Sequence, residues 1–358
     1  MDFKARAGKL EAALREKRLD GCVLTHLPNV RYLCGFTGSA GVLAAAGGKR
    51  AFFTDGRYTT QARAEVAGAR IVVSKRPALL EAMAWLRKQR ARRIGFEAEH
   101  VSVATQRRLG QETGKSTRLV ATAGLVERLR MIKEPEEIAQ IRAAVLLASG
   151  LFDHVLHSIK PGVKESDVAA ELEHAARRDG AEGMAFETIV ASGSRSALPH
   201  GRASSQPIQK NGLVILDFGV ILAGYCSDMT RTVCVGIPSK RQASLYRAVL
   251  DAQLAAIASV SPGQPVSKVD QAARSVLQKA GLGRYFTHST GHGVGIEIHE
   301  PPRVAKGQAE QLQPGMVVTV EPGIYLPGEG GVRIEDMVVV TESGCEVLTP
   351  TTKELIAL

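Results

Sequence analysis

Along the first third of the chain, short apolar runs alternate with amphipathic stretches. The apolar runs predict β-strands at residues 21–25, 41–46, 50–55, 70–74 and 92–97, and the amphipathic stretches predict helices at 3–18, 59–66, 78–89 and just after Ser102. Strands that alternate with helices are typical of an α/β domain. We therefore expect residues 1–130 to form an α/β domain with a mixed sheet.

The pattern changes after residue 130. A proline stands in the sequence Lys133-Glu134-Pro135-Glu136, and a long segment with helical periodicity follows it, through residue 159. Proline is favoured in the first turn of a helix, where its missing N–H costs no hydrogen bond. We place a domain boundary near residue 130 and expect a second domain at 131–358.

The second domain contains a faint internal repeat. Ile159-Lys160-Pro161-Gly162 matches Val260-Ser261-Pro262-Gly263 at an offset of 101 residues, and Ser166 and Val168 match Ser267 and Val269 at the same offset. In each copy a long helical pattern precedes the Pro-Gly pair, a shorter one follows it, and a strand-rich segment with a hairpin comes next. The repeat predicts two similar halves.

The first of these hairpins contains two acidic residues within apolar strands. Two apolar strands flank a turn at residues 222–224, and Asp217 and Asp228 lie symmetrically about position 222.5. If the hairpin turns there, the two carboxylates face each other, with about 5 Å between their Cβ atoms. Carboxylates this close in an apolar core repel each other unless they bind a cation or share a proton.

The second hairpin repeats the arrangement, because Glu321 and Glu335 are symmetric about Gly328. A glycine-rich segment between the hairpins contains His288, His292 and His299. One acid beside a glycine is more often a turn residue than a ligand, but four acids paired in two hairpins favour a cation site. Carboxylates with a neutral imidazole suit Mn²⁺, Co²⁺ or Zn²⁺ rather than a thiolate zinc site.

The chain has 358 residues and a formal net charge of +10, which is unevenly distributed. Residues 1–130 carry 25 basic and 11 acidic side chains, whereas residues 131–358 carry 21 and 25. The densest basic stretch, residues 87–93, continues a helical pattern and contains no aromatic residue. We interpret it as a solvated helix end, so no nucleic acid is expected as a partner.

The five cysteines are widely spaced and form no Cys-x-x-Cys pair (Cys22, Cys34, Cys226, Cys234 and Cys345). This spacing argues against a disulfide framework and a zinc ribbon, and we expect reduced thiols in a cytoplasmic protein. The first twenty residues lack the apolar core of a secretory signal. No run approaches the roughly 18 apolar residues of a membrane span, so no membrane association is expected.

In combination, these motifs resemble the metallopeptidases of the pita-bread fold, specifically the Xaa-Pro aminopeptidase and prolidase branch. The resemblance covers essentially the whole chain and implies an N-terminal creatinase-like α/β domain followed by a pita-bread catalytic domain. It also implies two divalent metal ions per chain, with manganese favoured over cobalt or zinc. The five implied ligands are Asp217 in DFG, Asp228 in SDMTRT, His292 in STGHGVG, Glu321 in VEPGIY and Glu335 in VRIED.

The resemblance extends to residues around the ligands. His200 in SALPHG, His288, His299 in IHEPP and Arg333 match positions that bind substrate, move protons and orient ligands. Glu321 would in addition accept a proton from a water shared by the two ions, and His288 or His299 would steady the oxyanion. A homodimer is implied by the resemblance alone.

Two Xaa-Pro activities remain open at this point. Residues 29–33, 35–41 and 54–58 look like aminopeptidase P, whereas Arg303 resembles a residue that binds the free carboxylate of a dipeptide in some prolidases. We predict an Xaa-Pro aminopeptidase that acts on peptides with an N-terminal Xaa-Pro, and keep Xaa-Pro dipeptidase as the alternative. A pita-bread protein that binds RNA or protein without catalysis is disfavoured by the complete ligand set.

Overall fold

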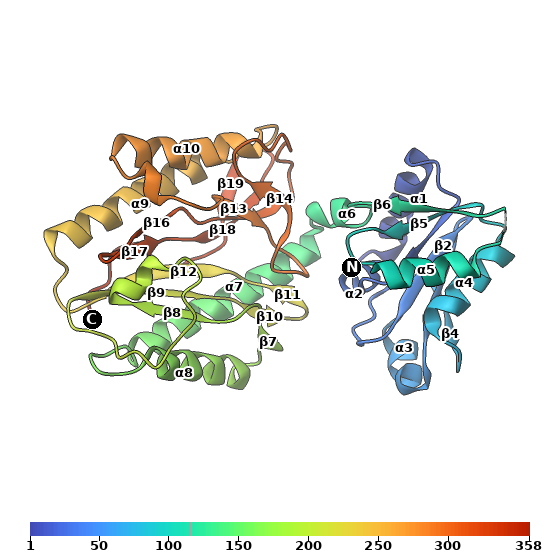
Figure 1. Cartoon of the computed structure of the whole chain (residues 1–358), viewed down its shortest axis with the longest axis horizontal. Coiled ribbons are helices and arrows are strands. Elements are labelled where there is room, and N and C mark those ends of the chain that lie inside the picture. The colour runs from blue at the N-terminus through green and yellow to red at the C-terminus, as the bar shows by residue number, and fades with distance from the viewer. Residues whose placement is uncertain (115) are drawn as a thin grey trace. The chain divides into compact units, whose positions relative to one another are not determined.

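The computed structural model describes residues 1–114 and 116–358. It divides into two compact units, Met1–Arg130 and Met131–Leu358, which Figure 1 shows in blue to cyan-green and in green to red. Each unit has its own sheets and its own hydrophobic core. They are therefore described separately.

Unit 1 contains a six-stranded sheet in the order β4-β3-β2-β1-β5-β6. β1 pairs in parallel with β5 and antiparallel with β2, so the sheet is mixed, as the sequence predicts. The strands are β1 (Gly21–Leu24), β2 (Val42–Ala46), β3 (Lys49–Thr54), β4 (Arg70–Val73), β5 (Arg93–Glu97) and β6 (Arg118–Thr122). The helices are α1 (Phe3–Glu16), α2 (Leu27–Cys34), α3 (Thr59–Glu65), α4 (Ala78–Lys88), α5 (Val103–Glu112) and α6 (Glu127–Met131).

Helix α2 is absent from the sequence prediction. It has eight residues, begins with a proline in its first turn, and ends at Gly35, whose φ of 85° suits glycine. Two turns are too short to display a clear 3.6-residue period. The proline and the glycine together were the available signal for this helix.

Unit 2 consists of two halves, each with a helix pair followed by strands. α7 (Pro135–Leu156) and α8 (Glu165–Arg178) open the first half, and α9 (Lys240–Ala258) and α10 (Val266–Lys279) open the second. Both ends of α10 lie 101 residues after the matching ends of α8, which is the offset of the sequence repeat. Figure 1 shows the two pairs on opposite sides of the strands.

The strands of unit 2 form sheets that belong to one half or the other. The first half supplies β8-β9-β12 and β7-β10-β11, and the second supplies β14-β13-β15-β18-β19 and β16-β17. The bounds are β7 (Gly183–Met184), β8 (Ile189–Ser192), β9 (Gly212–Phe218), β10 (Val220–Leu222), β11 (Tyr225–Cys226), β12 (Met229–Val235), β13 (Gly291–Gly293), β14 (Glu300–Val304), β15 (Val317–Val320), β16 (Gly323–Leu326), β17 (Gly330–Arg333), β18 (Asp336–Val340) and β19 (Cys345–Val347).

Helix α7 is long and apolar enough, by length and composition alone, to cross a membrane. The sequence analysis did not single it out as a possible membrane span, because charged residues interrupt its apolar positions and no uninterrupted apolar run results. Its apolar face is used within the fold: Ala144, Leu151 and Phe152 pack into the core of the first half, and Ile141 and Val145 into a second cluster. This packing is typical of a buried core helix.

The two acid-bearing hairpins differ in register. In the second, Gly323 pairs with Arg333 and Val320 with Asp336, so Glu321 lies opposite Glu335, as the symmetry about Gly328 predicts. In the first, Asp217 lies opposite Thr230, and the prediction that it faces Asp228 directly is wrong by two residues. Ala223 and Gly224 both have positive φ and form a tight two-residue turn, which sets the register.

Candidate metal centre and substrate pocket

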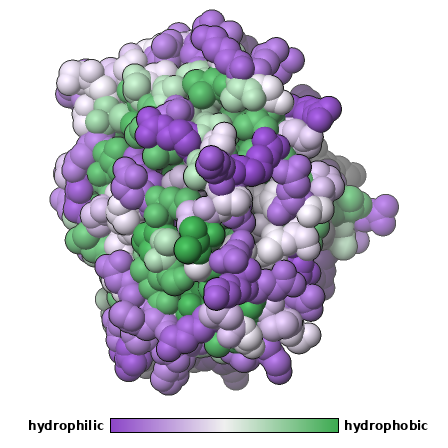
Figure 2. Space-filling view, turned by 90° about the vertical axis from the view of Figure 1, so that its left-hand side faces the viewer, coloured by the Kyte–Doolittle hydropathy of each residue, from purple (hydrophilic) through white to green (hydrophobic). Residues whose placement is uncertain are grey.

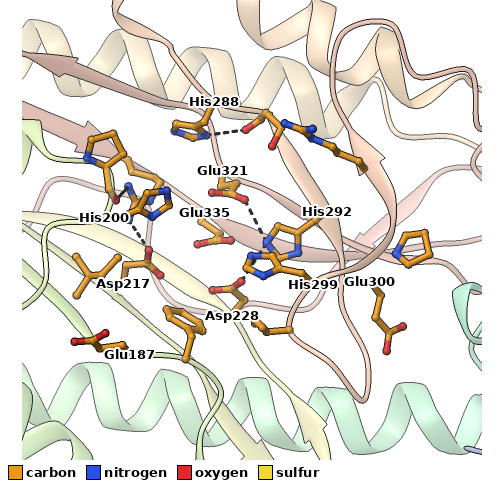
Figure 3. A pocket seen from close by; sticks show the side chains of 18 of the residues that line it. Glu187, His200, Asp217, Asp228, His288, His292, His299, Glu300, Glu321 and Glu335 are labelled. Atoms are coloured by element: carbon orange, nitrogen blue, oxygen red, sulfur yellow. Dashed lines mark hydrogen bonds and ion pairs between the residues drawn. The ribbon is translucent and has the colours of Figure 1, made fainter. Parts of the chain in front are cut away.

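A pocket of about 840 Å³ opens in unit 2 where the strands of its two halves meet. Strand β12 contacts β17 and β18 there, and Thr232 Oγ1 donates to Arg333 O at 2.9 Å. The pocket brings together all ten residues that the sequence singled out: His200, Asp217, Asp228, His288, His292, His299, Arg303, Glu321, Arg333 and Glu335. Figure 3 shows the carboxylates of Asp217, Asp228, Glu321 and Glu335 around a common centre with His292.

The carboxylates have the geometry of a cation site. One ligand atom each from Asp228, His292 and Glu335 lies within 4.8 Å of the others. Asp217 Oδ1 and Glu335 Oε1 are buried and have no hydrogen-bond partner among the residues that the structure describes. Buried oxygens without a donor are costly, and a divalent ion would satisfy them. The residues present therefore fit a metal ion.

The acids perturb one another strongly. Burial raises the pKa of Asp228 well above its usual range, and the charges of Glu335, Asp217 and Glu321 add to the effect. Burial likewise raises the pKa of Glu321 to about 8, with Asp217 contributing. The pKa of Glu335 is raised for the same reasons. A cation among these groups would favour their charged forms.

His292 presents its Nε2 to the acids. Its Nδ1 lies 3.0 Å from Gly293 O, which can only accept a hydrogen bond, so Nδ1 carries the proton. The Nε2 lone pair then faces Glu321 at 3.4 Å and Asp228 at 3.6 Å. Burial lowers the pKa of His292 to about 4. A neutral imidazole with a fixed tautomer is the form that binds metals.

His288 is held differently, because both of its ring nitrogens have partners. Nδ1 lies 2.7 Å from Ser289 O and therefore donates, so Nε2 accepts from the Tyr325 hydroxyl at 2.8 Å. Burial, followed by the charge of Arg333, lowers the pKa of His288 to about 4. In this arrangement His288 has no N–H left to donate to a substrate oxygen.

Arg333 connects this histidine to the acids. It is 3% exposed, donates to Asp217 Oδ2 through Nη2, and donates to the Tyr325 hydroxyl at 2.6 Å through Nη1. Its Nε donates to Thr230 Oγ1 at 3.1 Å, and Thr230 in turn donates to Glu335 Oε2 at 2.6 Å. One guanidinium thus orients ligand candidates from both hairpins.

The remaining site residues surround the opening. His200 and His299 are exposed to the pocket, and the His299 ring meets the His292 ring edge to face at 4.4 Å. Arg303 lies directly opposite His292 in the β13–β14 ladder.

Sequence reasoning missed the side chains that hold the acids. Thr230 bonds to Glu335, Thr319 donates to Glu321 Oε1 at 3.2 Å, and Tyr325 joins His288 to Arg333. Thr319 precedes Glu321 by two residues on its strand, and Thr230 follows Asp228 by two. Because alternate strand residues share a face, this spacing was the signal available for both threonines.

The chain matches two known protein families, one in each unit. Residues 139–342 match the family model of metallopeptidase family M24, and residues 6–132 match that of the creatinase/prolidase N-terminal domain. The chain belongs to metallopeptidase family M24. The two-domain fold expected from the sequence, a creatinase-like domain followed by a pita-bread domain, is confirmed for this M24 peptidase.

Several proteins similar to this M24 chain are Xaa-Pro peptidases by name. An Xaa-Pro dipeptidase from Pyrococcus furiosus is 46% identical over 232 residues, which cover 65% of this chain and 67% of the relative. A solved Xaa-Pro dipeptidase from Bacillus anthracis is 41% identical, covers 100% of both chains and has a TM-score of 0.97. An X-Pro aminopeptidase from Thermotoga maritima is 34% identical over 97% of this chain and 100% of that one, with a TM-score of 0.90.

These comparisons bear on the choice between the two activities. Both kinds of peptidase match the M24 chain across unit 1 as well as unit 2, so the first-domain motifs do not separate them. The dipeptidase is the more similar of the two structures. The aminopeptidase prediction rested on those motifs. The comparisons therefore favour its alternative, an Xaa-Pro dipeptidase, over it.

Proposed function

We propose that this M24 metallopeptidase is an Xaa-Pro dipeptidase. The observation that carries the proposal is Arg303, which lines the pocket opposite His292. In the part of the chain that the structure describes, Arg303 has no carboxylate partner, whereas Arg202 at the same pocket pairs with Glu187 at 2.8 Å. An arginine without an acidic partner beside the candidate metal centre is suited to bind the free carboxylate of a dipeptide.

The proposed metal site takes two divalent ions, with manganese favoured. Asp217, Asp228, His292, Glu321 and Glu335 would hold them, because their oxygens and the His292 Nε2 converge in one buried cluster. Bound ions of this kind polarise a carbonyl and lower the pKa of water. The chain's own side chains then bind the substrate and move the proton.

Glu321 is the proposed proton acceptor. Its carboxylate lies in the proposed ligand cluster, where Oε1 is 3.4 Å from His292 Nε2 and accepts from Thr319 Oγ1 at 3.2 Å. A base that takes up a proton readily can pass it on to the leaving nitrogen of proline. Of the two histidines predicted to steady the oxyanion, His299 is the better candidate, because both nitrogens of His288 are already engaged.

The proposal is tested by comparing Ala-Pro with Ala-Pro-Ala in wild type, Arg303→Ala and Arg202→Ala. A charge-assisted contact to the terminal carboxylate contributes about 1.5–3 kcal/mol, so Arg303→Ala should lower kcat/KM for Ala-Pro by about 10- to 100-fold. The tripeptide should be a poor substrate and lose little. Arg202→Ala, the matched control, removes an arginine that already has a partner and should change both substrates equally.

An equal loss on both peptides, with efficient cleavage of the tripeptide, would instead support an X-Pro aminopeptidase. The similarity to the Thermotoga maritima structure makes that activity the second candidate.

A homodimer stays a prediction, and light scattering on the purified protein tests it.

A further inference from the structure

A buried ion pair lies at the wall of the pocket, where Glu300 is a lining residue whose carboxylate points away from the acidic cluster. Lys133 Nζ is 3.1 Å from Glu300 Oε2, and the two side chains are 1% and 2% exposed. A buried pair adds little net stability, because the loss of hydration offsets the attraction. Its place in the fold is therefore more informative than its strength: Glu300 directly follows His299 and begins β14.

The Glu300 carboxylate organises the loop of residues 294–299, which joins β13 to β14. Its Oε1 accepts from the Glu297 N–H at 3.1 Å. A Cβ at Gly295 would lie 2.7–2.9 Å from the carboxylate, so a larger residue at 295 would have to displace the Glu300 side chain or the loop. The 294–299 loop is thus wrapped around this carboxylate.

Lys133 reaches the carboxylate from a fixed segment. Its backbone N–H donates to Gly315 O at 2.9 Å, and the preceding Ile132 forms an isolated bridge with Met316. These contacts place the ammonium group immediately before α7. The pair therefore ties the 294–299 loop to a part of unit 2 that the pocket does not include.

His299 depends on this loop for its position. In the described part of the chain no hydrogen bond holds its ring, which is exposed to the pocket and contacts His292 edge to face. Figure 3 shows the His299 ring directed toward the acidic cluster and the Glu300 carboxylate directed away from it. The side chains of the adjacent residues His299 and Glu300 thus point to opposite sides of one backbone segment. Because the Glu300 contacts hold this segment, they also determine where the His299 ring lies.

We infer that Lys133 and Glu300 are positioning residues that hold His299 at the substrate. The inference rests on the proposed function, which gives His299 its contact with the substrate oxyanion. Neither Lys133 nor Glu300 touches the reacting atoms in this account. They act by fixing the 294–299 loop.

A double-mutant cycle tests the inference on whichever Xaa-Pro peptide the protein hydrolyses. Glu300→Gln should lower kcat/KM about tenfold, mainly through kcat, because small displacements of a catalytic group are costly. In a His299→Ala background the same change should have almost no further effect. The control is Glu97→Gln, which alters a carboxylate of unit 1 that is 3% exposed and accepts from the Thr25 N–H at 2.6 Å and from Asn29 Nδ2 at 2.8 Å. Its effect should be additive with His299→Ala.

Hydrogen exchange in the metal-free protein gives a readout that does not depend on activity. Amides of the 294–299 loop should exchange faster in Glu300→Gln and at the wild-type rate in Glu97→Gln. If Glu300→Gln does not fold, Lys133→Met/Glu300→Gln replaces it, because that pair leaves no buried charge uncompensated. The inference would be overturned if the losses of kcat/KM in Glu300→Gln and His299→Ala were additive and the amides of the 294–299 loop exchanged at the wild-type rate in Glu300→Gln. A preference for tripeptides would overturn only the dipeptidase proposal.

Discussion

Each of three acids at the candidate centre has one oxygen held by a neighbouring side chain. Arg333 holds Asp217, Thr230 holds Glu335, and Thr319 holds Glu321. The second oxygens of Asp217 and Glu335 are buried, with no hydrogen bond from any part of the chain that the structure describes. Held in this way, the carboxylates are oriented before a cation arrives, and less rotamer entropy is lost when it binds.

We predict that Glu321→Gln lowers kcat by about 10²- to 10⁴-fold and changes KM little. The reason is that an amide cannot accept the proton that general-base catalysis transfers. Steady-state kinetics on Ala-Pro, with the metal content of both proteins measured by mass spectrometry, provide the check. Normal turnover with only a raised KM would remove Glu321 from the role of base.

The sequence predicted which residues gather at the site better than it predicted what holds them. The acids and histidines stood out because ionisable groups are unusual within apolar strands. Tyr325 carries no such signal, since tyrosine is a common strand residue, and the only signal for Thr230 is its two-residue spacing from Asp228. The role of Thr230 depends on its contact with Glu335 and that of Tyr325 on its contact with His288, and periodicity does not predict either contact.

Among the elements, the two hairpins position the acids through close backbone approaches. At Gly219, between β9 and β10, an added Cβ would lie 1.8 Å from Ser227 O, which no rotamer change can relieve. This contact lies between Asp217 and Asp228 along the chain. Tight packing of the backbone here therefore sets how far apart the two carboxylates lie.

We expect Gly219→Ala to destabilise the protein by about 2 kcal/mol or more, because the new methyl group forces the backbone apart. Gly150→Ala is the control: Gly150 lies within α7, and nothing lies within 4 Å of an added Cβ. That change should be neutral or stabilise by up to about 1 kcal/mol through helix propensity. Urea unfolding of both variants measures the difference, and equal stabilities would contradict this account of the hairpin.

The register of these hairpins marks the limit of sequence reasoning about elements. Symmetry about Gly328 placed Glu321 opposite Glu335 correctly, whereas symmetry about residues 222–224 placed Asp228 two positions from its observed place. The difference lies in the turn, because the positive φ of Ala223 is a feature that few residues other than glycine adopt. A pattern of apolar and polar residues does not predict it.

On the scale of the whole molecule, the two halves of unit 2 bring their acids together at one site. Figure 2 shows a face of the molecule on which apolar side chains gather in the middle with hydrophilic ones around them. Each half has an apolar core, and a further apolar cluster packs residues of the first half, such as Ile141 and Tyr225, against Val317 and Met337 of the second. Without a cation, bringing these acids together has a free-energy cost, because burial and mutual repulsion raise the pKa values of Asp228, Glu321 and Glu335.

This cost predicts how stability depends on pH. Glu321 has a pKa of about 8 in the folded protein, well above its value in an unfolded chain, so the folded state binds more protons. From about pH 7 to 8 the metal-free protein should lose stability as pH rises. His288 and His292, with pKa values lowered to about 4, are neutral in the folded state throughout this window and nearly so in the unfolded chain.

Thermal unfolding of the metal-free protein at pH 7 and pH 8 measures this loss. Mn²⁺ should raise Tm more at the higher pH, where the carboxylates are charged. A metal-free Tm that stays level across the window would contradict the proposed electrostatics of the cluster.

Substrate length and metal dependence together distinguish a metal-dependent Xaa-Pro dipeptidase from the other candidates. Wild-type protein is stripped of metal, reconstituted with Mn²⁺ and incubated with Ala-Pro and Ala-Pro-Ala, and the products are identified by mass. The account predicts release of alanine and proline from the dipeptide, little cleavage of the tripeptide, and no activity before Mn²⁺ is added. Efficient release of alanine from Ala-Pro-Ala, or hydrolysis that needs no metal, would contradict it.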